Sequence, residues 1–181
     1  MAHFEKETAC EELYKGRIFD LRRHEVTLED GSPAVREVIH HNGGVCVAAL
    51  DEQARIFLVR QFRFPTGQEQ IELPAGKLEK GENPMEAAFR ELEEETGYCS
   101  KYLSPLGSII PTPAYCTEVI HMFTTSKVTP TAQNLDEGEF LSVLRVPFAE
   151  AVQMVLQGDI TDAKTQVGIL MLKARLDAEK A

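Results

Sequence analysis

A short segment near the middle of the chain carries a complete set of helix signals. Asn83 is a favourable N-cap residue, and Pro84 suits the first helical position because that position needs no amide hydrogen. Gly97 can adopt the left-handed conformation that ends many helices. We therefore predict a helix from Pro84 to about Thr96, and the rest of the fold has to be built around it.

The predicted helix has two different faces. At about 100° per residue, its apolar residues gather on one side, which should pack on a core: Met85, Ala88, Phe89 and Leu92. Glu91, Glu94 and Glu95 occupy the adjacent arc, where each pair repels by roughly 0.2 to 0.5 kcal/mol. A divalent cation would reverse that sign, because Mg²⁺ prefers carboxylate oxygens together with phosphate oxygens. Most Glu-rich helix faces are simply solvated, so residues outside the helix must decide whether this face binds a metal ion.

Apolar segments on both sides of this helix predict a mixed α/β fold. Val45–Leu50 and Ile56–Val59 are separated by a polar turn, and we expect them to be buried strands that begin the main sheet. Further strands are expected near residues 108–110, 119–124 and 140–146, and helices near 148–156 and 162–176. Strands before and after one central helix favour a mixed sheet covered on both faces over repeated βαβ units.

The N-terminal part predicts a separate antiparallel β-sheet segment. Between about Tyr14 and Val38, single apolar residues stand among charged ones, and Asp30-Gly31 is a strong hairpin signal. Gly43 and Gly44 separate this part from the first apolar run. We therefore predict an N-terminal antiparallel segment at residues 1–42 and a main domain at residues 43–181.

Charge and hydropathy exclude two classes of partner. The net charge is -10 at pH 7, and no cluster of Lys and Arg could neutralise a run of phosphates, so nucleic acid is not expected. The N-terminal segment is charged throughout, and no apolar run approaches the roughly 20 residues that cross a bilayer. We therefore expect no membrane partner.

The cysteine and histidine residues give little sign of a site. Cys10, Cys46, Cys99 and Cys116 form neither a CxxC pair nor a His/Cys ligand spacing, so we expect neither a zinc site nor disulfides. Reduced thiols favour a cytoplasmic location. His40-His41 beside Asn42-Gly43 admits a metal or proton-transfer site, but a solvated strand end is the more common reason for such a pair.

The helix is also part of a longer pattern that identifies a family. Eight residues fit the spacing G-x5-E-x7-R-E-U-x-E-E-x-G-U, where U is bulky and apolar: Gly76, Glu82, Arg90, Glu91, Leu92, Glu94, Glu95 and Gly97. With this spacing the segment resembles the Nudix box. Tyr98 at the last position is the one departure, a conservative change that concerns loop packing.

The resemblance implies a Nudix-type α/β/α sandwich and a Mg²⁺-dependent pyrophosphohydrolase, with Mn²⁺ as a substitute. Glu91 and Glu95 would be the principal metal ligands, with Glu94 assisting and the backbone carbonyl of Ala75 completing the shell. Glu82 would lie in the outer shell. Arg90 would pair with a box carboxylate and orient it, a role that suits a guanidinium fork.

In ADP-ribose pyrophosphatases, a carboxylate outside the box often serves as the base or as a further metal ligand. The corresponding stretch here is Leu135–Phe140. Glu139 is the first candidate for this role and Glu137 the second. The alternative is an exposed acidic loop before a strand.

Residues outside the box resemble the ADP-ribose and ADP-sugar pyrophosphatase branch. They are the stretches Arg60–Pro65 and Ile71–Gly76, and Pro113, although Thr112 and Ala114 depart from the Ser-Pro-Gly often seen there. This branch implies hydrolysis of ADP-ribose to AMP and ribose 5-phosphate by a homodimer. Arg36 and Arg63 would hold the anionic diphosphate, and Phe19 or Tyr14 would stack on adenine.

Two alternatives to an ADP-ribose hydrolase stay open. One is a Nudix hydrolase for GDP-mannose or another nucleotide sugar. The other is a nucleotide-sensing domain that no longer turns over its ligand. The intact Glu91, Glu94 and Glu95 argue against a sensor, because mutually repelling carboxylates gain nothing without a cation.

Overall fold

The computed structural model describes residues 3–180, which divide into two compact units. One unit extends to Gly43 and includes Ile110–Val119, and the other comprises Gly44–Ile109 and the residues from Ile120 onward. Backbone hydrogen bonds attach the 110–119 loop to the first unit. The Ile39 amide donates to the Tyr115 carbonyl (2.8 Å), and the Thr117 amide donates to the Ile39 carbonyl (2.9 Å).

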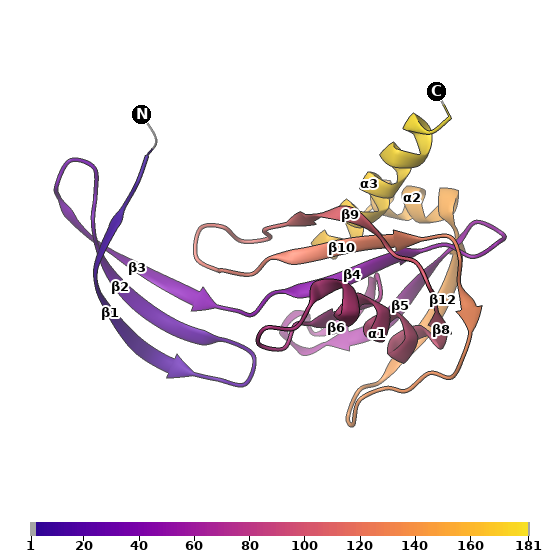
Figure 1. Cartoon of the computed structure of the whole chain (residues 1–181), viewed down its shortest axis with the longest axis horizontal. Coiled ribbons are helices and arrows are strands. Elements are labelled where there is room, and N and C mark those ends of the chain that lie inside the picture. Colours follow the sequence, from indigo (N-terminus) through magenta and orange to yellow (C-terminus); the bar gives the residue numbers. More distant parts are fainter. Residues whose placement is uncertain (1–2, 181) are drawn as a thin grey trace. The chain divides into compact units, whose positions relative to one another are not determined.

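The N-terminal unit is an antiparallel sheet with the order β1-β2-β3 (Figure 1). Its strands are β1 (Lys6–Lys15), β2 (Asp20–Thr27) and β3 (Pro33–His40). The predicted turn at Asp30-Gly31 joins β2 to β3, with Gly31 at a φ of 84°. The predicted antiparallel segment is confirmed. Most of β1, however, precedes the predicted strand region, because all ten of its residues are exposed and show no apolar pattern.

The other unit contains two larger sheets and one short one. The mixed sheet has the order β7-β4-β10-β9, with β4 and β10 parallel: β7 (Ala75–Lys77), β4 (Gly44–Ala49), β10 (Ile120–Thr125) and β9 (Ser104–Ile109). The second sheet is antiparallel, with the order β12-β5-β6: β12 (Leu141–Pro147), β5 (Arg55–Arg63) and β6 (Gln68–Glu72). The short sheet pairs β8 (Tyr98–Cys99) with β11 (Thr129–Pro130), and a 3-10 turn, η1 (Phe64–Thr66), follows β5.

One prediction about the sheets is wrong. The two apolar runs that were expected to begin one sheet, β4 and β5, belong to different sheets. They share only a bridge between Leu50 and Ile56 at the turn that joins them. Beyond this bridge each strand pairs with other strands, β4 with β7 and β10, and β5 with β6 and β12.

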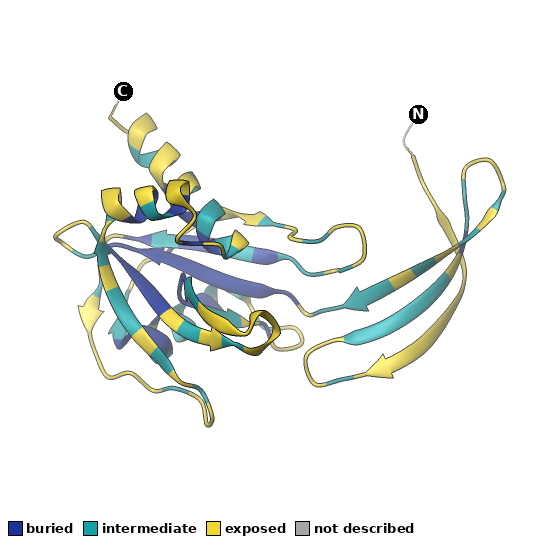
Figure 2. Cartoon of the chain, turned by 180° about the vertical axis from the view of Figure 1, so that it is seen from behind, coloured by how far each residue is buried: buried dark blue, intermediate teal, exposed yellow. Residues whose placement is uncertain are grey.

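Helices pack on both sides of strand β4 in the mixed sheet. All six residues of β4 are buried, and they alternate between two cores. Cys46 and Ala48 pack with α2 (Phe148–Gln157) and α3 (Ala163–Ala178), whereas Val45 and Val47 pack with α1 (Pro84–Thr96). Figures 1 and 2 show the helices on either side of the buried strands. This confirms the predicted α/β/α sandwich.

The central helix α1 has the predicted bounds. The Asn83 side chain accepts a hydrogen bond from the Met85 amide (2.9 Å), and Gly97 ends the helix at a φ of 68°. Ala88 and Leu92 are buried in the core. None of the helices in the described part of the chain combines the length and apolar composition that a bilayer crossing requires.

Candidate active site

The carboxylate face of α1 lies against strand β7. The backbone amide of Ala75 donates a hydrogen bond to Glu95 Oε2 (2.9 Å). This contact joins two segments that are 20 residues apart in sequence and leaves Glu95 only 3% exposed. The helix and the strand together form the base of the site.

Gly76 on β7 lies directly against the side chain of Glu91 on α1. A Cβ atom at this position would lie 1.8 Å from Glu91 Oε1 and 1.9 Å from Glu91 Cδ. The backbone at Gly76 is not in the left-handed region, so conformational freedom is not the reason for a glycine. Gly76 is required because the carboxylate of Glu91 occupies the space that any side chain would need.

Arg90 joins three of the carboxylates around the helix. Its Nη1 lies 2.8 Å from both Glu91 Oε1 and Glu94 Oε2, and its Nη2 lies 3.2 Å from Glu82 Oε1. The Glu79 amide also donates to Glu82, and with Arg90 it lowers the pKa of Glu82. Arg90 therefore holds the loop before the helix and the helix face in one arrangement.

The carboxylates that face β7 carry raised pKa values. Burial, with the negative charges of Glu91 and Glu139, raises the pKa of Glu95 to about 8. Burial also raises the pKa of Glu91, with further contributions from Glu94 and Glu139, although Arg90 opposes the shift. Burial and the neighbouring carboxylates therefore both disfavour the charged forms of Glu91 and Glu95.

Of the two carboxylates proposed outside the box, the structure brings only Glu139 to this cluster. Glu139 Oε1 lies 3.5 Å from the Nε2 of Gln61 on β5, and its charge contributes to the raised pKa values of Glu91 and Glu95. Glu137 lies in an exposed turn. The sequence does not indicate that Gln61, on strand β5, lies beside Glu139, in the loop before β12.

Arg63 lies in a second polar group beside the carboxylates. Its guanidinium binds Glu72 with two hydrogen bonds, Nε to Oε1 (2.6 Å) and Nη2 to Oε2 (2.9 Å). Lys164 also donates to Glu72 and lies 3.1 Å from Asp162. Burial raises the pKa of Glu72, but Arg63 and Lys164 outweigh this effect and hold the pKa at about 2. Sequence reasoning found Arg63 but missed Glu72 as its partner, and Lys164.

This polar group lines a hollow of about 400 Å³. Arg63, Thr66 and Gln70 form one side, and residues 161–164 form the other. The charge of Arg63 partly opposes the rise in the pKa of Glu95, so the guanidinium is within electrostatic reach of this carboxylate. The hollow therefore offers cationic and hydrogen-bonding groups next to the acidic centre.

The other predicted substrate residues belong to the N-terminal unit. Arg36 on β3 pairs with Glu5, through Nε to Oε2 (3.0 Å) and Nη2 to Oε1 (2.5 Å). Phe19 lies between β1 and β2, is 38% exposed, and has its ring centroid 5.9 Å from that of Tyr14. Both aromatic rings are therefore accessible.

Family comparisons agree with this arrangement. The model of the NUDIX domain matches residues 40–166, and that of the nucleoside diphosphate sugar hydrolase N-terminal domain matches residues 9–39. This chain belongs to the NUDIX family. The helix α1, with Arg90 and its carboxylates, is thus the Nudix helix of the family.

Similar proteins include an ADP-ribose pyrophosphatase of Bacillus subtilis (strain 168), 39% identical over 180 residues and 97% of both chains. A protein named methanol dehydrogenase activator, from Bacillus methanolicus, is 36% identical over 171 residues, which cover 93% of this chain and 92% of that protein. A solved structure described as an ADP compounds hydrolase matches with a TM-score of 0.85 at 22% identity, covering 96% of each chain. This last likeness confirms the Nudix fold.

Nudix hydrolases generally need a divalent metal ion, and the residues beside Gly76 fit one. The donor groups are carboxylate oxygens, which hard cations such as Mg²⁺ prefer. Burial and neighbouring carboxylates raise the pKa values of Glu91 and Glu95, so a cation at these residues would favour their charged forms. The absence of a side chain at Gly76 leaves the Glu91 carboxylate its place in this group.

Proposed function

We propose that this Nudix protein hydrolyses the diphosphate bond of ADP-ribose, giving AMP and ribose 5-phosphate. The observation that carries the proposal is the packing of two carboxylates of the Nudix helix against β7, with Glu91 at Gly76 and Glu95 bonded to the Ala75 amide. The B. subtilis relative, which matches nearly the full length of this chain, is named ADP-ribose pyrophosphatase. In the reaction, a water oxygen bonds to one phosphorus, and the bridging oxygen leaves with the other phosphate.

We propose Mg²⁺ as the cofactor, with Mn²⁺ able to replace it. Glu91, Glu94, Glu95 and Glu139 would hold the cation, together with the backbone carbonyl of Ala75. When bound, such a cation supplies positive charge for the diphosphate oxygens and makes water more acidic.

The residues of this chain then have distinct parts in the reaction. Arg90 keeps Glu91 and Glu94 in place through its paired contacts. Glu139 accepts the proton of the attacking water, and Glu137 is the second candidate for this part. Arg63, which two hydrogen bonds hold to Glu72, attracts the substrate diphosphate.

The N-terminal segment has a proposed role of its own. Residues 1–42 supply homodimer contacts and, through Arg36 and Phe19, further substrate contacts, while residues 43–181 carry the hydrolytic site. The exposed apolar side chains of this segment, among them Leu13 and Ile18, support an interface. We propose a cytoplasmic location, which the four free cysteines support.

Product analysis tests the proposed activity. Purified full-length protein is incubated in Mg²⁺ with ADP-ribose, GDP-mannose or NADH, and the products are separated by chromatography. We expect AMP and ribose 5-phosphate from ADP-ribose, and no product from the Glu95→Gln variant. Turnover of GDP-mannose but not ADP-ribose would overturn the substrate and keep the chemistry. Binding of ADP-ribose without turnover of any compound would identify a sensor.

A further inference from the structure

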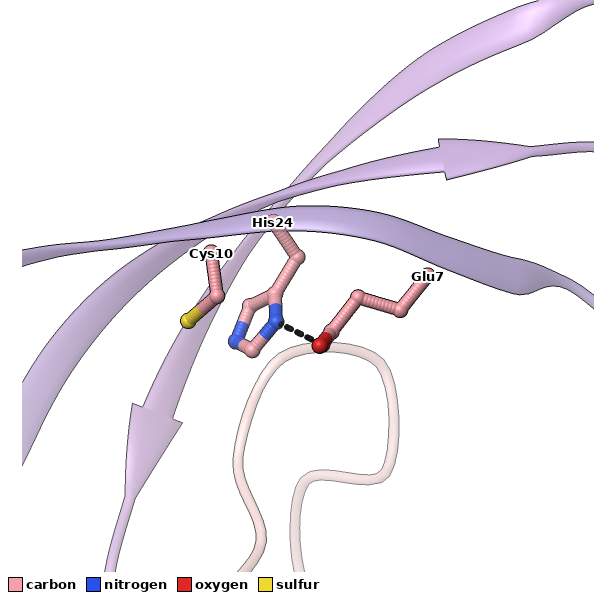
Figure 3. A group of neighbouring side chains, drawn as sticks. All are labelled: Glu7, Cys10 and His24. Carbon is pink, nitrogen blue, oxygen red and sulfur yellow. Dashed lines mark hydrogen bonds and ion pairs between the residues drawn. The ribbon is translucent and has the colours of Figure 1, made fainter.

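A cluster of metal-binding side chains lies on the N-terminal sheet, which belongs to a different unit from the residues of the acidic centre. The ligand atoms of Glu7, Cys10 and His24 all lie within 4.8 Å of one another. Figure 3 shows the ring of His24 between the Cys10 thiol and the Glu7 carboxylate. A second imidazole, that of His40, joins the group through His24, with 3.1 Å between the two Nε2 atoms.

An irregularity in β1 creates the cluster. Side chains three residues apart in a regular strand point to opposite faces, so Glu7 and Cys10 would be separated. The pairing of β1 with β2 shifts between Glu7 and Ala9, which is the mark of a β-bulge. The extra residue returns Cys10 to the face of Glu7 and places it directly opposite His24.

The hydrogen bond of His24 to Glu7 determines which ring nitrogen has a lone pair to offer to a metal ion. Glu7 Oε2 lies 2.6 Å from His24 Nδ1, and a carboxylate only accepts hydrogen bonds, so Nδ1 carries the proton. The lone pair of the ring is then on Nε2, which accepts a hydrogen bond from His40 Nε2 while no metal is bound. A carboxylate behind a histidine is the usual way in which proteins orient a metal-binding imidazole.

His40 is suited to be a second nitrogen ligand. Its Nε2 already contacts the Nε2 of His24, so a His40 ring with its proton on Nδ1 would present a second lone pair at the same place. Two nitrogen ligands of a tetrahedral Zn²⁺, at bond lengths of about 2.0 to 2.1 Å, are roughly 3.3 Å apart. The 3.1 Å between His24 Nε2 and His40 Nε2 is close to this separation.

We propose that Cys10 Sγ, His24 Nε2 and His40 Nε2 bind one Zn²⁺ or similar borderline-soft cation, with Glu7 orienting His24. Water takes the fourth position. When the metal binds, the Cys10 thiol releases its proton to solvent and the proton of the His40 ring moves from Nε2 to Nδ1. The sulfur and nitrogen donors select a different ion from the carboxylates of α1, which favour Mg²⁺. The protein therefore has two chemically distinct metal sites.

Cobalt binding tests this site separately from the Nudix site. Full-length protein is stripped of metal, placed in excess Mg²⁺ to occupy the carboxylates, and titrated with Co²⁺ as a spectroscopic substitute for Zn²⁺. We expect one Co²⁺ per chain with a thiolate-to-cobalt charge-transfer band in the near ultraviolet, which Zn²⁺ abolishes by displacement. The Cys10→Ser variant should lose the band, and His24→Gln and His40→Gln should each weaken Zn²⁺ binding by about 10- to 100-fold.

Matched controls separate the proposed ligands from other thiols and imidazoles. Cys116→Ser and His121→Gln should keep the band and the affinity of the unaltered protein. Zn²⁺ should also slow alkylation of Cys10 by iodoacetamide, read by mass spectrometry, and should fail to do so in His24→Gln. Absence of the band in the unaltered protein, or its persistence in Cys10→Ser, would overturn the site. Hydrolysis of ADP-ribose by Cys10→Ser is expected to be unchanged, so the two proposals fail independently.

Discussion

At the scale of single residues, Gly76 is a position in the acidic centre that has no space for a side chain. We expect Gly76→Ala to lower kcat/KM for ADP-ribose by about a hundredfold, because the new Cβ would meet the Glu91 carboxylate at 1.8 Å and displace it. Steady-state kinetics, with circular dichroism to check the fold, measures this effect.

Gly31→Ala is a matched control that should lower stability without changing activity. A Cβ atom at Gly31 would have no neighbour within 4 Å, but the φ of 84° at this position would strain any residue other than glycine. The control should cost about 1 kcal/mol of stability and leave kcat/KM unchanged. Full activity of Gly76→Ala would show that Glu91 can move without consequence and would remove Gly76 from the site.

The two acidic residues of the loop before β12 can also be separated by substitution. Glu139 influences the pKa values of Glu91 and Glu95, whereas Glu137 is exposed in a turn. We expect Glu139→Gln to reduce kcat at least about a hundredfold and Glu137→Gln to change it less than about twofold. Single-turnover kinetics of both variants measures the difference. The reverse ranking would transfer the proposed proton acceptor to Glu137.

How much of the candidate site can be predicted from the sequence depends on the separation of its residues. Glu91, Glu94 and Glu95 are neighbours on one helix, so their spacing alone shows that they share a face. Lys164 and Glu72 are 92 residues apart, and no local pattern reports their contact. The grouping of Cys10 with His24 is equally hidden, because it depends on strand register and on a bulge rather than on ligand spacing.

At the scale of elements, Glu72 connects the end of β6 to β5 and to the start of α3. Its carboxylate has a pKa of about 2 in the folded protein, below the ordinary 4.5, so deprotonation stabilises the fold. This stabilisation is complete above about pH 4.5 and disappears as the pH falls toward 2. A shift of this size corresponds to about 3 kcal/mol.

Glu72→Gln tests this connection. We expect the variant to be less stable than the unaltered protein by about 3 kcal/mol at pH 7, with the difference shrinking steadily below pH 4.5. Urea unfolding at a series of pH values measures it. Glu69→Gln, an exposed change on the same strand, should stay within about 0.5 kcal/mol at every pH. A difference for Glu72→Gln that does not depend on pH would contradict the assignment.

Prediction of the elements from sequence succeeded where local signals define them. The capping residues of α1 fix both of its ends, and its predicted bounds are those of the structure. β1 was largely missed because an edge strand with ten exposed residues has no burial pattern to detect. The sheet membership of β4 and β5 was wrong because two apolar runs joined by a turn look the same whether the strands stay paired or separate.

At the scale of the whole molecule, the proposed homodimer can be tested through the N-terminal segment. Leu13 and Ile18 are 46% and 60% exposed, and a second copy of the chain would cover such apolar surface. We expect a mass of about twice 20.2 kDa by light scattering, and a single-chain mass for the double variant Leu13→Glu, Ile18→Glu. Leu156→Glu, at an exposed position on α2, should remain a dimer. A single-chain mass for the unaltered protein would contradict the proposal.

The buried strand β4 has a further consequence for how the acidic centre is aligned. Because β4 is apolar on both faces, a slip by one residue would still place apolar side chains in both cores, so polarity does not set its register. Size contributes to it, because a Cβ at Gly44 would lie only 3.0 Å from the Gly76 carbonyl oxygen, and a slip that brought Val45 to that place would make a tight contact. The small size of Gly44 thus helps to determine where β7 presents Gly76 to Glu91.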